Sequence, residues 1–163
     1  MKSSQPNKNP ESLSSTTAHL EVGRRGERLA AAYLEQQGYA IVAANFTLPV
    51  GRNMRGAVVN AEIDLVAYEG PTLCFVEVKT RSSDWFAPPQ ANVDLRKRRQ
   101  IVRAARAYRR MLGLEGSSYR YDVVSIVLPG ETDEPGSLQI EILRGYWTED
   151  KLRKRRWHQW HYD

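Results

Sequence analysis

The sequence predicts an α/β fold in which a mixed β-sheet is flanked by helices. Two segments repeat apolar residues at the three- and four-residue spacing of a helix, and five short segments have the composition of β-strands. Their order along the chain is αβββαββ, and the tail can form a further short helix. This order is typical of helices packed on a sheet. With 163 residues the chain has room for one domain around a single core.

The N-terminal third is predicted to contain a disordered segment, a helix and a strand. Residues 1–16 are rich in Ser, Pro, Asn and Lys without periodicity, so we expect them to be disordered. A helix follows over about 17–37 and ends at Gly38, a residue type that readily adopts the left-handed conformation of a helix cap. A strand over 39–46 comes next, and then a loop over 47–60. The apolar stripe of the helix comprises Leu20, Gly23, Glu27, Ala30, Ala31 and Leu34.

The middle of the chain is predicted to form a hairpin and a long helix. Segments 61–68 and 72–80 have the pattern of strands, and the Glu-Gly-Pro between them is a turn signal. The helix is expected to start after Asp94, which can cap its first turn, and to stop at Gly113. At about 100° per residue, its apolar and basic positions fall on opposite faces. The apolar face has Ile101, Ala105, Tyr108 and Leu112, with Lys97 on its flank; the basic face, called the arginine stripe below, has Arg96, Arg99, Arg103, Arg106 and Arg110.

Two further strands are predicted over 121–128 and 137–143, and a basic segment closes the chain. We therefore assign residues 17–148 to one domain and residues 149–163 to a basic tail or short helix.

The net charge of +5 is unevenly spread along the chain. Residues 94–110 carry +7 and residues 151–156 carry +5, which leaves −7 for the remainder. A basic patch on an acidic body is typical of a protein that binds a polyanion. Two solvated helix faces are the alternative explanation.

Composition excludes several classes of protein. Cys74 is the only cysteine, which excludes an intramolecular disulfide and a cysteine-based zinc site, and its place in a strand predicts a small core residue. No apolar run approaches the roughly 18 residues of a membrane span, and the N-terminal residues lack the apolar run of a signal peptide. We therefore expect a soluble cytoplasmic protein with no membrane partner.

Three carboxylates and a lysine lie among apolar residues. Glu27 is in the helical stripe, Asp64 is inside one strand, and Glu77 is inside the next strand with Lys79 two residues later. Residues two apart in a strand face the same way, so Glu77 and Lys79 point to one side, and pairing close to the turn places Asp64 across from Glu77 or near it. Carboxylate oxygens suit Mg²⁺ or Mn²⁺.

Each of these residues also has a purely structural explanation. A Glu-x-Lys is common on a solvated strand face, and an Asp in a strand can hydrogen-bond a turn. The helical Glu27 can form a buried ion pair with Arg25 or Arg81. The conjunction of a helix Glu, a strand Asp, a short turn and a strand Glu-x-Lys is more specific, and it favours a metal site. Gly23 and Gly26 predict a close approach of backbone near Glu27.

Several stretches of the chain carry a family pattern: Gly23-Arg24-Arg25-Gly26-Glu27, Glu62-Ile63-Asp64-Leu65-Val66-Ala67, Phe75-Val76-Glu77-Val78-Lys79-Thr80-Arg81 and Arg120-Tyr121-Asp122-Val123-Val124. With Lys97, Ala104, Ala105 and Tyr108 in the long helix, they resemble the YraN-like family of small bacterial predicted endonucleases over roughly residues 23–147. The chain departs from the family at Ala61, where a Gly is usual, and at Ile63, where the superfamily motif has a Pro.

The resemblance implies the restriction-endonuclease-like PD-(D/E)xK fold of Holliday-junction resolvases. It places Glu27, Asp64, Glu77 and Lys79 at the catalytic positions. It further implies one or two Mg²⁺ or Mn²⁺ ions held by Asp64, Glu77, the backbone carbonyl of Val78 and Glu27. The implied activity is metal-dependent endonuclease hydrolysis of phosphodiester bonds in structured or branched DNA, and related resolvases suggest a homodimer.

The arginine stripe, Lys97 and Arg81 are the expected contacts to nucleic acid. Contacts to phosphates position a duplex without reading its sequence, and they make binding fall steeply with salt. Two other functions stay open: a non-catalytic nucleic-acid-binding module of the same fold, and an interaction protein whose basic helix docks on an acidic partner.

Overall fold

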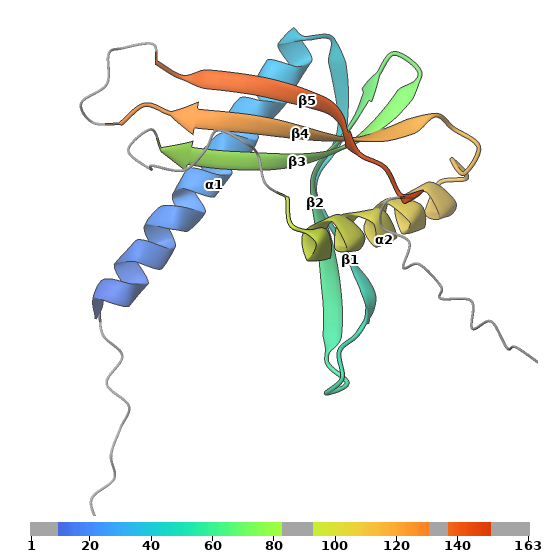
Figure 1. The fold of residues 1–163 in the computed structure, drawn as a ribbon, viewed down its shortest axis with the longest axis horizontal. Helices are drawn as coiled ribbons and strands as arrows, with labels where there is room; N and C mark the ends of the chain where they lie inside the picture. The colour runs from blue at the N-terminus through green and yellow to red at the C-terminus, as the bar shows by residue number, and fades with distance from the viewer. Residues whose placement is uncertain (1–9, 83–92, 131–136, 151–163) are drawn as a thin grey trace, which may run out of the picture.

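The computed structural model describes residues 10–82, 93–130 and 137–150. A five-stranded mixed sheet in the order β1-β2-β3-β4-β5 is flanked by helices (Figure 1). This confirms the predicted α/β class and the element order αβββαββ, and it is consistent with a restriction-endonuclease-like fold. The elements are α1 (Pro10–Gln36), β1 (Tyr39–Arg52), β2 (Val58–Glu69), β3 (Thr72–Ser82), α2 (Leu95–Met111), β4 (Tyr119–Leu128) and β5 (Gln139–Trp147).

The sheet is mixed because α2 joins β3 to β4. These two strands run parallel, while the pairs β1–β2, β2–β3 and β4–β5 are antiparallel. Parallel neighbours need a crossover connection, which here is the long helix. No helix in the described part of the chain is long and apolar enough to cross a membrane.

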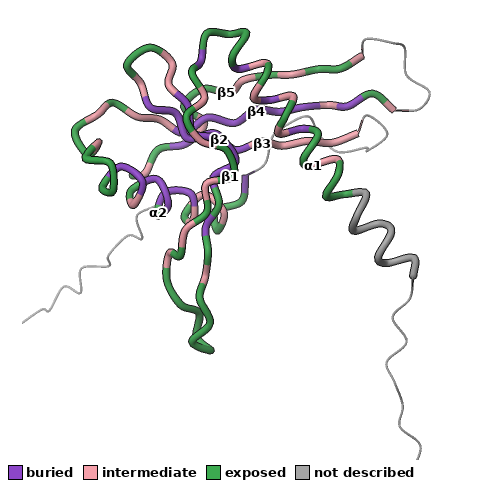
Figure 2. The backbone as a smooth tube through the Cα atoms, turned by 180° about the vertical axis from the view of Figure 1, so that it is seen from behind, coloured by how far each residue is buried: buried purple, intermediate pink, exposed green. Residues whose placement is uncertain are grey.

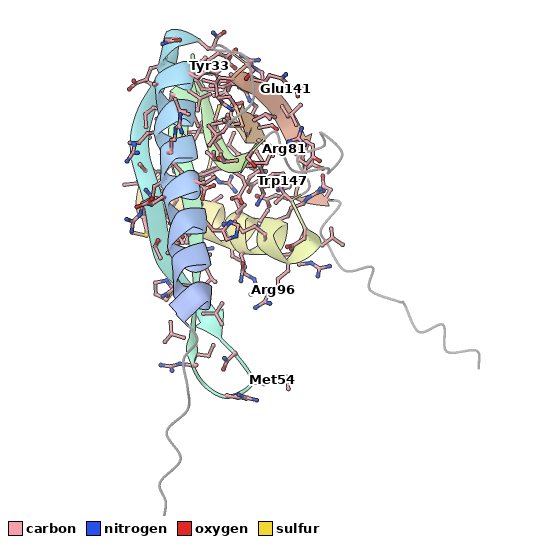
Figure 3. All side chains as sticks on the ribbon, turned by 90° about the vertical axis from the view of Figure 1, so that its left-hand side faces the viewer. Tyr33, Met54, Arg81, Arg96, Glu141 and Trp147 are labelled. Carbon is pink, nitrogen blue, oxygen red and sulfur yellow. The ribbon has the colours of Figure 1, made fainter. Side chains whose placement is uncertain are left out.

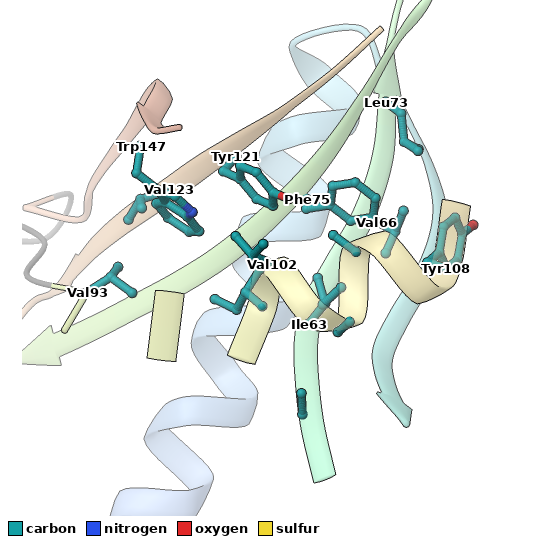
Figure 4. Close-up of a cluster of buried hydrophobic side chains, with 14 residues drawn as sticks. Ile63, Val66, Leu73, Phe75, Val93, Val102, Tyr108, Tyr121, Val123 and Trp147 are labelled. Atoms are coloured by element: carbon teal, nitrogen blue, oxygen red, sulfur yellow. The ribbon is translucent and has the colours of Figure 1, made fainter. Parts of the chain in front are cut away.

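The two helices cover opposite faces of the sheet, and alternate strand residues fill the two interfaces. Val66 and Phe75 belong to the apolar cluster beneath α2, drawn in Figure 4, whereas their neighbours Leu65 and Val76 belong to the cluster that also contains Leu34 of α1. The period of two in a strand gives this division. Full burial of a side chain such as Phe75 contributes about 1.5–3 kcal/mol, so these clusters fix the position of both helices. Figure 2 shows the buried backbone concentrated where the helices cross the sheet.

Cys74 lies in the cluster beneath α1 and is fully buried, as predicted. Burial raises the pKa of its thiol to about 12, which removes the thiolate needed for nucleophilic chemistry.

The N-terminal boundary of the first helix differs from the prediction. Helix α1 begins at Pro10 rather than near residue 17, so residues 10–16 of the segment expected to be disordered are helical. Proline is favoured in the first turn of a helix, where its missing N–H would have no intrahelical partner. Residues 1–9 lie outside the described residues, as do residues 151–163 of the predicted tail.

The prediction of a loop over residues 47–60 is wrong, because most of this segment forms a β-hairpin. β1 continues to Arg52 and β2 begins at Val58, with Thr47 paired to Glu62 and Arg52 paired to Val58. The glycines in this stretch indicated a loop, but Gly51 instead lies at a register shift of the ladder.

Helix α2 has the predicted caps. Asp94 accepts a hydrogen bond from the backbone N–H of Lys97 at 2.8 Å, and Gly113 follows the helix with φ of +66°. Leu112 was predicted to lie on the apolar face, but it is 55% exposed. It forms the C-cap, where the chain leaves the helical path and no longer follows the 100° rotation.

Candidate functional site

The turn between β2 and β3 places Asp64 next to Glu77, as the sequence predicted. The ladder between these strands ends at the pair Leu65 and Val76, so Asp64 and Glu77 occupy the next opposing position. Beyond the end of the ladder, Asp64 Oδ2 accepts a hydrogen bond from the backbone N–H of Val78 at 2.7 Å. Because Phe75 belongs to the cluster beneath α2, the period of two places Glu77 on the face of β3 that α2 covers.

Both carboxylates are buried. Asp64 is 8% exposed and Glu77 is 2% exposed. Burial, followed by the negative charge of Glu77, raises the pKa of Asp64 to about 7; the more distant charge of Glu27 adds to this effect. Two buried acids side by side are costly to keep ionised, so the pair favours a cation between or beside them.

Two lysines supply cations at Glu77. Lys79, on the same strand, donates a hydrogen bond from Nζ to Glu77 Oε1 at 2.9 Å. Lys97, from the first turn of α2, places Nζ 3.3 Å from Glu77 Oε2 without forming a hydrogen bond to it, and Oε2 has no hydrogen-bond partner among the described residues. Burial lowers the pKa of Lys97, but the charges of Glu77 and Asp64 outweigh it and raise this pKa above its ordinary value.

Lys97 is thus part of the candidate site, beside the carboxylate pair, and not only of the basic surface of α2. The sequence placed it on the flank of the apolar face of the helix. That position on the flank is the sequence feature that could have predicted the contact of Lys97 with Glu77, because a long side chain on the flank of a packed helix can reach the edge of the sheet below.

Glu27 is not brought into direct contact with the pair. It lies on α1, which packs on the other face of the sheet, and it is half-buried. No described residue forms a hydrogen bond or an ion pair with Glu27, so the alternative of a structural ion pair has no partner within residues 10–82, 93–130 and 137–150. In the same residues, no group of three His, Cys, Asp or Glu side chains is close enough together to hold a metal ion.

Gly26 determines how closely α1 approaches the sheet beside Glu27. A Cβ at Gly26 would lie 1.7 Å from Thr80 Oγ1 and 2.8 Å from Thr80 Cβ, so rotation of the threonine cannot relieve the overlap. The predicted close approach is therefore confirmed at Gly26, whereas a Cβ at Gly23 would meet nothing within 4 Å.

Replacing Gly26 with Ala should destabilise the fold by about 1–3 kcal/mol, because α1 must move away from β3. Gly23→Ala is the matched control. It removes a glycine from the same helix without a clash, so it should stabilise the protein by up to about 1 kcal/mol. Urea unfolding of both variants measures the difference, and equal stability of the two would contradict the proposed close packing.

The arginine stripe is exposed along α2, on the side away from the core, as predicted. Arg106 donates from Nε to Glu149 Oε2 at 2.8 Å, and Arg110 Nε lies 3.7 Å from Glu115 Oε1. The other stripe members form no ion pair within the described ranges. Arg81 is half-buried on β3, two residues beyond Lys79 and thus on the same side of the strand. Figure 3 shows the positions of Arg81 and Arg96 relative to α2.

Comparison with known proteins finds relatives of unassigned activity. Residues 26–126 match the model of UPF0102, described as an uncharacterised protein family. The chain is 44% identical over 123 residues to a UPF0102 protein of Solibacter usitatus (strain Ellin6076), which covers 76% of this chain and 83% of the relative. It is 40% identical over 123 residues to a UPF0102 protein of Moorella thermoacetica (strain ATCC 39073 / JCM 9320), covering 76% of this chain and 92% of the relative. The matched region contains Glu27, the carboxylate pair and both lysines.

Proposed function

Since this chain belongs to the uncharacterised protein family UPF0102, the YraN family that its sequence resembles, we propose a function from the geometry of its site. The protein is a metal-dependent endonuclease that hydrolyses phosphodiester bonds in structured or branched DNA. The observation that carries the proposal is the buried pair Asp64 and Glu77 with two lysine ammonium groups beside it. A purely structural role would leave the cost of burying two adjacent acids without a benefit.

The donor set fits Mg²⁺ or Mn²⁺. Glu77 Oε2 is buried, and its one partner among the described residues is the Lys97 ammonium group 3.3 Å away. Hard oxygen ligands are those that these cations prefer. Asp64, Glu77 and the carbonyl oxygen of Val78 would hold the ion, and Glu27, which contacts neither acid, would complete the site through a bound water. Mg²⁺ commonly uses one or two carboxylates and completes its coordination with water and substrate phosphates, so the pair is sufficient protein support. A bound ion would supply a Lewis acid for the phosphate and a more acidic attacking water.

The two lysines act at different points around Glu77. Lys79 is fixed by its hydrogen bond to Glu77 Oε1, and from there it orients the attacking water and offsets the negative charge that develops at phosphorus. Lys97 enters from α2 on the opposite oxygen, where its ammonium group binds an oxygen of the scissile or the adjacent phosphate. Both ammonium groups are preorganised by the same carboxylate, so little rearrangement is needed during the reaction.

The arginine stripe provides the contacts to the nucleic-acid backbone. Arg96, the first residue of the stripe, directly precedes Lys97 in the first turn of α2. A DNA strand bound along the stripe would therefore reach the carboxylate pair at the end of the stripe. Phosphate contacts of this kind carry no sequence information, which favours recognition of structure over sequence.

A cleavage assay on labelled DNA tests the proposal. The panel contains duplexes, flaps, single strands and four-way junctions of one sequence, each with Mg²⁺, Mn²⁺ or EDTA. We expect cleavage with either metal and none with EDTA. Salt-sensitive binding without cleavage under every condition would instead support a non-catalytic nucleic-acid-binding module. Absence of both binding and cleavage would overturn both functions.

A further inference from the structure

The hairpin formed by the first two strands extends beyond the sheet. β2 pairs with β3 only from Leu65 to Glu69, so the residues of β2 before this point have β1 as their sheet partner. We call residues 47–61 the arm; Figure 1 shows it projecting past α2. Because Asp64 lies where β2 leaves β3, the arm is a direct extension of the strand that carries the candidate active site.

The base of the arm is fixed to the body of the protein. The ring of Phe46 meets that of Tyr108 of α2 edge-on, with 5.0 Å between centroids. Leu48 and Val50 follow on the same face and pack against the apolar cluster beneath α2. The base of the arm is therefore packed against α2, the helix that carries the arginine stripe.

The tip of the arm is also ordered by hydrogen bonds. The side chain of Asn53 accepts from the backbone N–H groups of Arg55 at 2.9 Å and Ala57 at 3.0 Å. Arg52 donates from its guanidinium group to the carbonyl oxygen of Gly56 at 2.7 Å. A turn closed in this way can present a side chain in one direction without a further entropic cost.

The side chain at the end of this turn is Met54, which is 105% exposed. An apolar side chain in full solvent contributes nothing to the core. It stands between Arg52 and Arg55, and residues 47–61 contain no acidic residue. Figure 3 shows Met54 at the end of the arm and Arg96 at the start of α2. An apolar tip flanked by cations and continuous with a basic helix is complementary to a nucleic-acid duplex.

We propose that the arm is a wedge that inserts Met54 between base pairs of duplex DNA at a step where stacking is already interrupted, as at a branch point. This inference rests on the proposed function and names the feature that selects its substrate. Apolar side chains, methionine included, unstack base steps in this manner, and the energy of unstacking opposes binding. The cost is smallest where the stack is already broken, so the wedge favours branched over intact duplexes. Arg55 holds a flanking phosphate, while Arg52 keeps the turn closed.

The test measures binding of the full-length chain in EDTA, so that cleavage plays no part. The probe is a four-way junction with 2-aminopurine at the branch point, compared with a linear duplex of the same sequence. Wild type should bind the junction more tightly and raise the fluorescence of the 2-aminopurine. Met54→Ala should weaken junction binding by about tenfold and remove the fluorescence rise, while binding to the linear duplex changes less than about twofold.

Met111→Ala is the matched control, because Met111 is also an exposed methionine, at 69%, but belongs to the end of α2 and not to the arm. It should behave as wild type. Equal junction affinity of Met54→Ala and Met111→Ala overturns the wedge and leaves the nuclease proposal intact. A change of oligomeric state on sedimentation of Met54→Ala, with unchanged DNA binding, also overturns it in favour of a dimer contact. Failure of the wild type to bind either DNA overturns the wedge and the proposed function together.

Discussion

Replacing Glu77 with Gln is expected to reduce metal-dependent cleavage by about a thousandfold or more while the protein remains folded. The substitution keeps the shape of the side chain, and its amide oxygen can still accept the hydrogen bond from Lys79. It removes the negative charge that holds both lysines and that a divalent cation requires. Single-turnover cleavage of a labelled junction in Mg²⁺ measures the loss, and circular dichroism verifies the fold.

Glu141→Gln is the control for this experiment, because Glu141 is exposed on β5 and distant in the sheet from β2. It makes the same chemical change and should leave cleavage unaltered. Lys79→Ala should lose roughly 10²–10³-fold, since the donor at Glu77 Oε1 is removed. Wild-type rates in Glu77→Gln or Lys79→Ala would refute the assignment of the active site.

Replacing Asp64 with Asn is expected to stabilise the metal-free protein at pH 8 and to abolish its stabilisation by Mn²⁺. Burial and the charge of Glu77 raise the pKa of Asp64 to about 7, above the value of about 3.9 expected in the unfolded chain. The folded state therefore binds the proton more tightly. Its contribution to stability is fully present below about pH 4 and is lost as the pH rises through about 7. At pH 8 the wild type buries an ionised carboxylate, and the variant avoids this cost, on the order of 2 kcal/mol.

Thermal unfolding in EDTA at pH 5 and pH 8 measures this effect. The advantage of Asp64→Asn over wild type should be larger at pH 8 than at pH 5. Added Mn²⁺ should raise the Tm of the wild type at pH 8 by mass action, but not that of the variant. Glu141→Gln, which changes an exposed acid on β5, should retain the response of the wild type to both pH and Mn²⁺. A variant that is less stable than wild type at pH 8 in EDTA, or one that Mn²⁺ still stabilises, would contradict this account.

The adjacency of Asp64 and Glu77 could be predicted from the sequence because it depends on local geometry. The two residues are separated by one hairpin with a short turn, and the period of two in a strand assigns them to the same face. The caps of α2 could also be predicted from the sequence, since Asp94 and Gly113 act on their immediate neighbours.

The arm was missed because its local signals conflict. Gly51, Gly56 and Pro49 indicate a loop, while Phe46, Leu48 and Val50 alternate as in a strand. The alternating residues prevail because they pack against the cluster beneath α2, and a proline is tolerated in β1, which is an edge strand. Neither the edge position nor that packing can be seen in the segment alone.

The class of the fold, the order of its elements and the carboxylate pair could be predicted from local sequence patterns, because periodicity and turn chemistry act over a few residues. Three features can be seen only in the folded protein: Lys97 comes close to Glu77, Glu27 contacts neither acid of the pair, and Met54 lies at the tip of the arm. These positions depend on how α1 and α2 pack on the sheet. That packing is set by the contact of Gly26 with Thr80 and by the apolar clusters on the two faces, which join residues far apart in the chain.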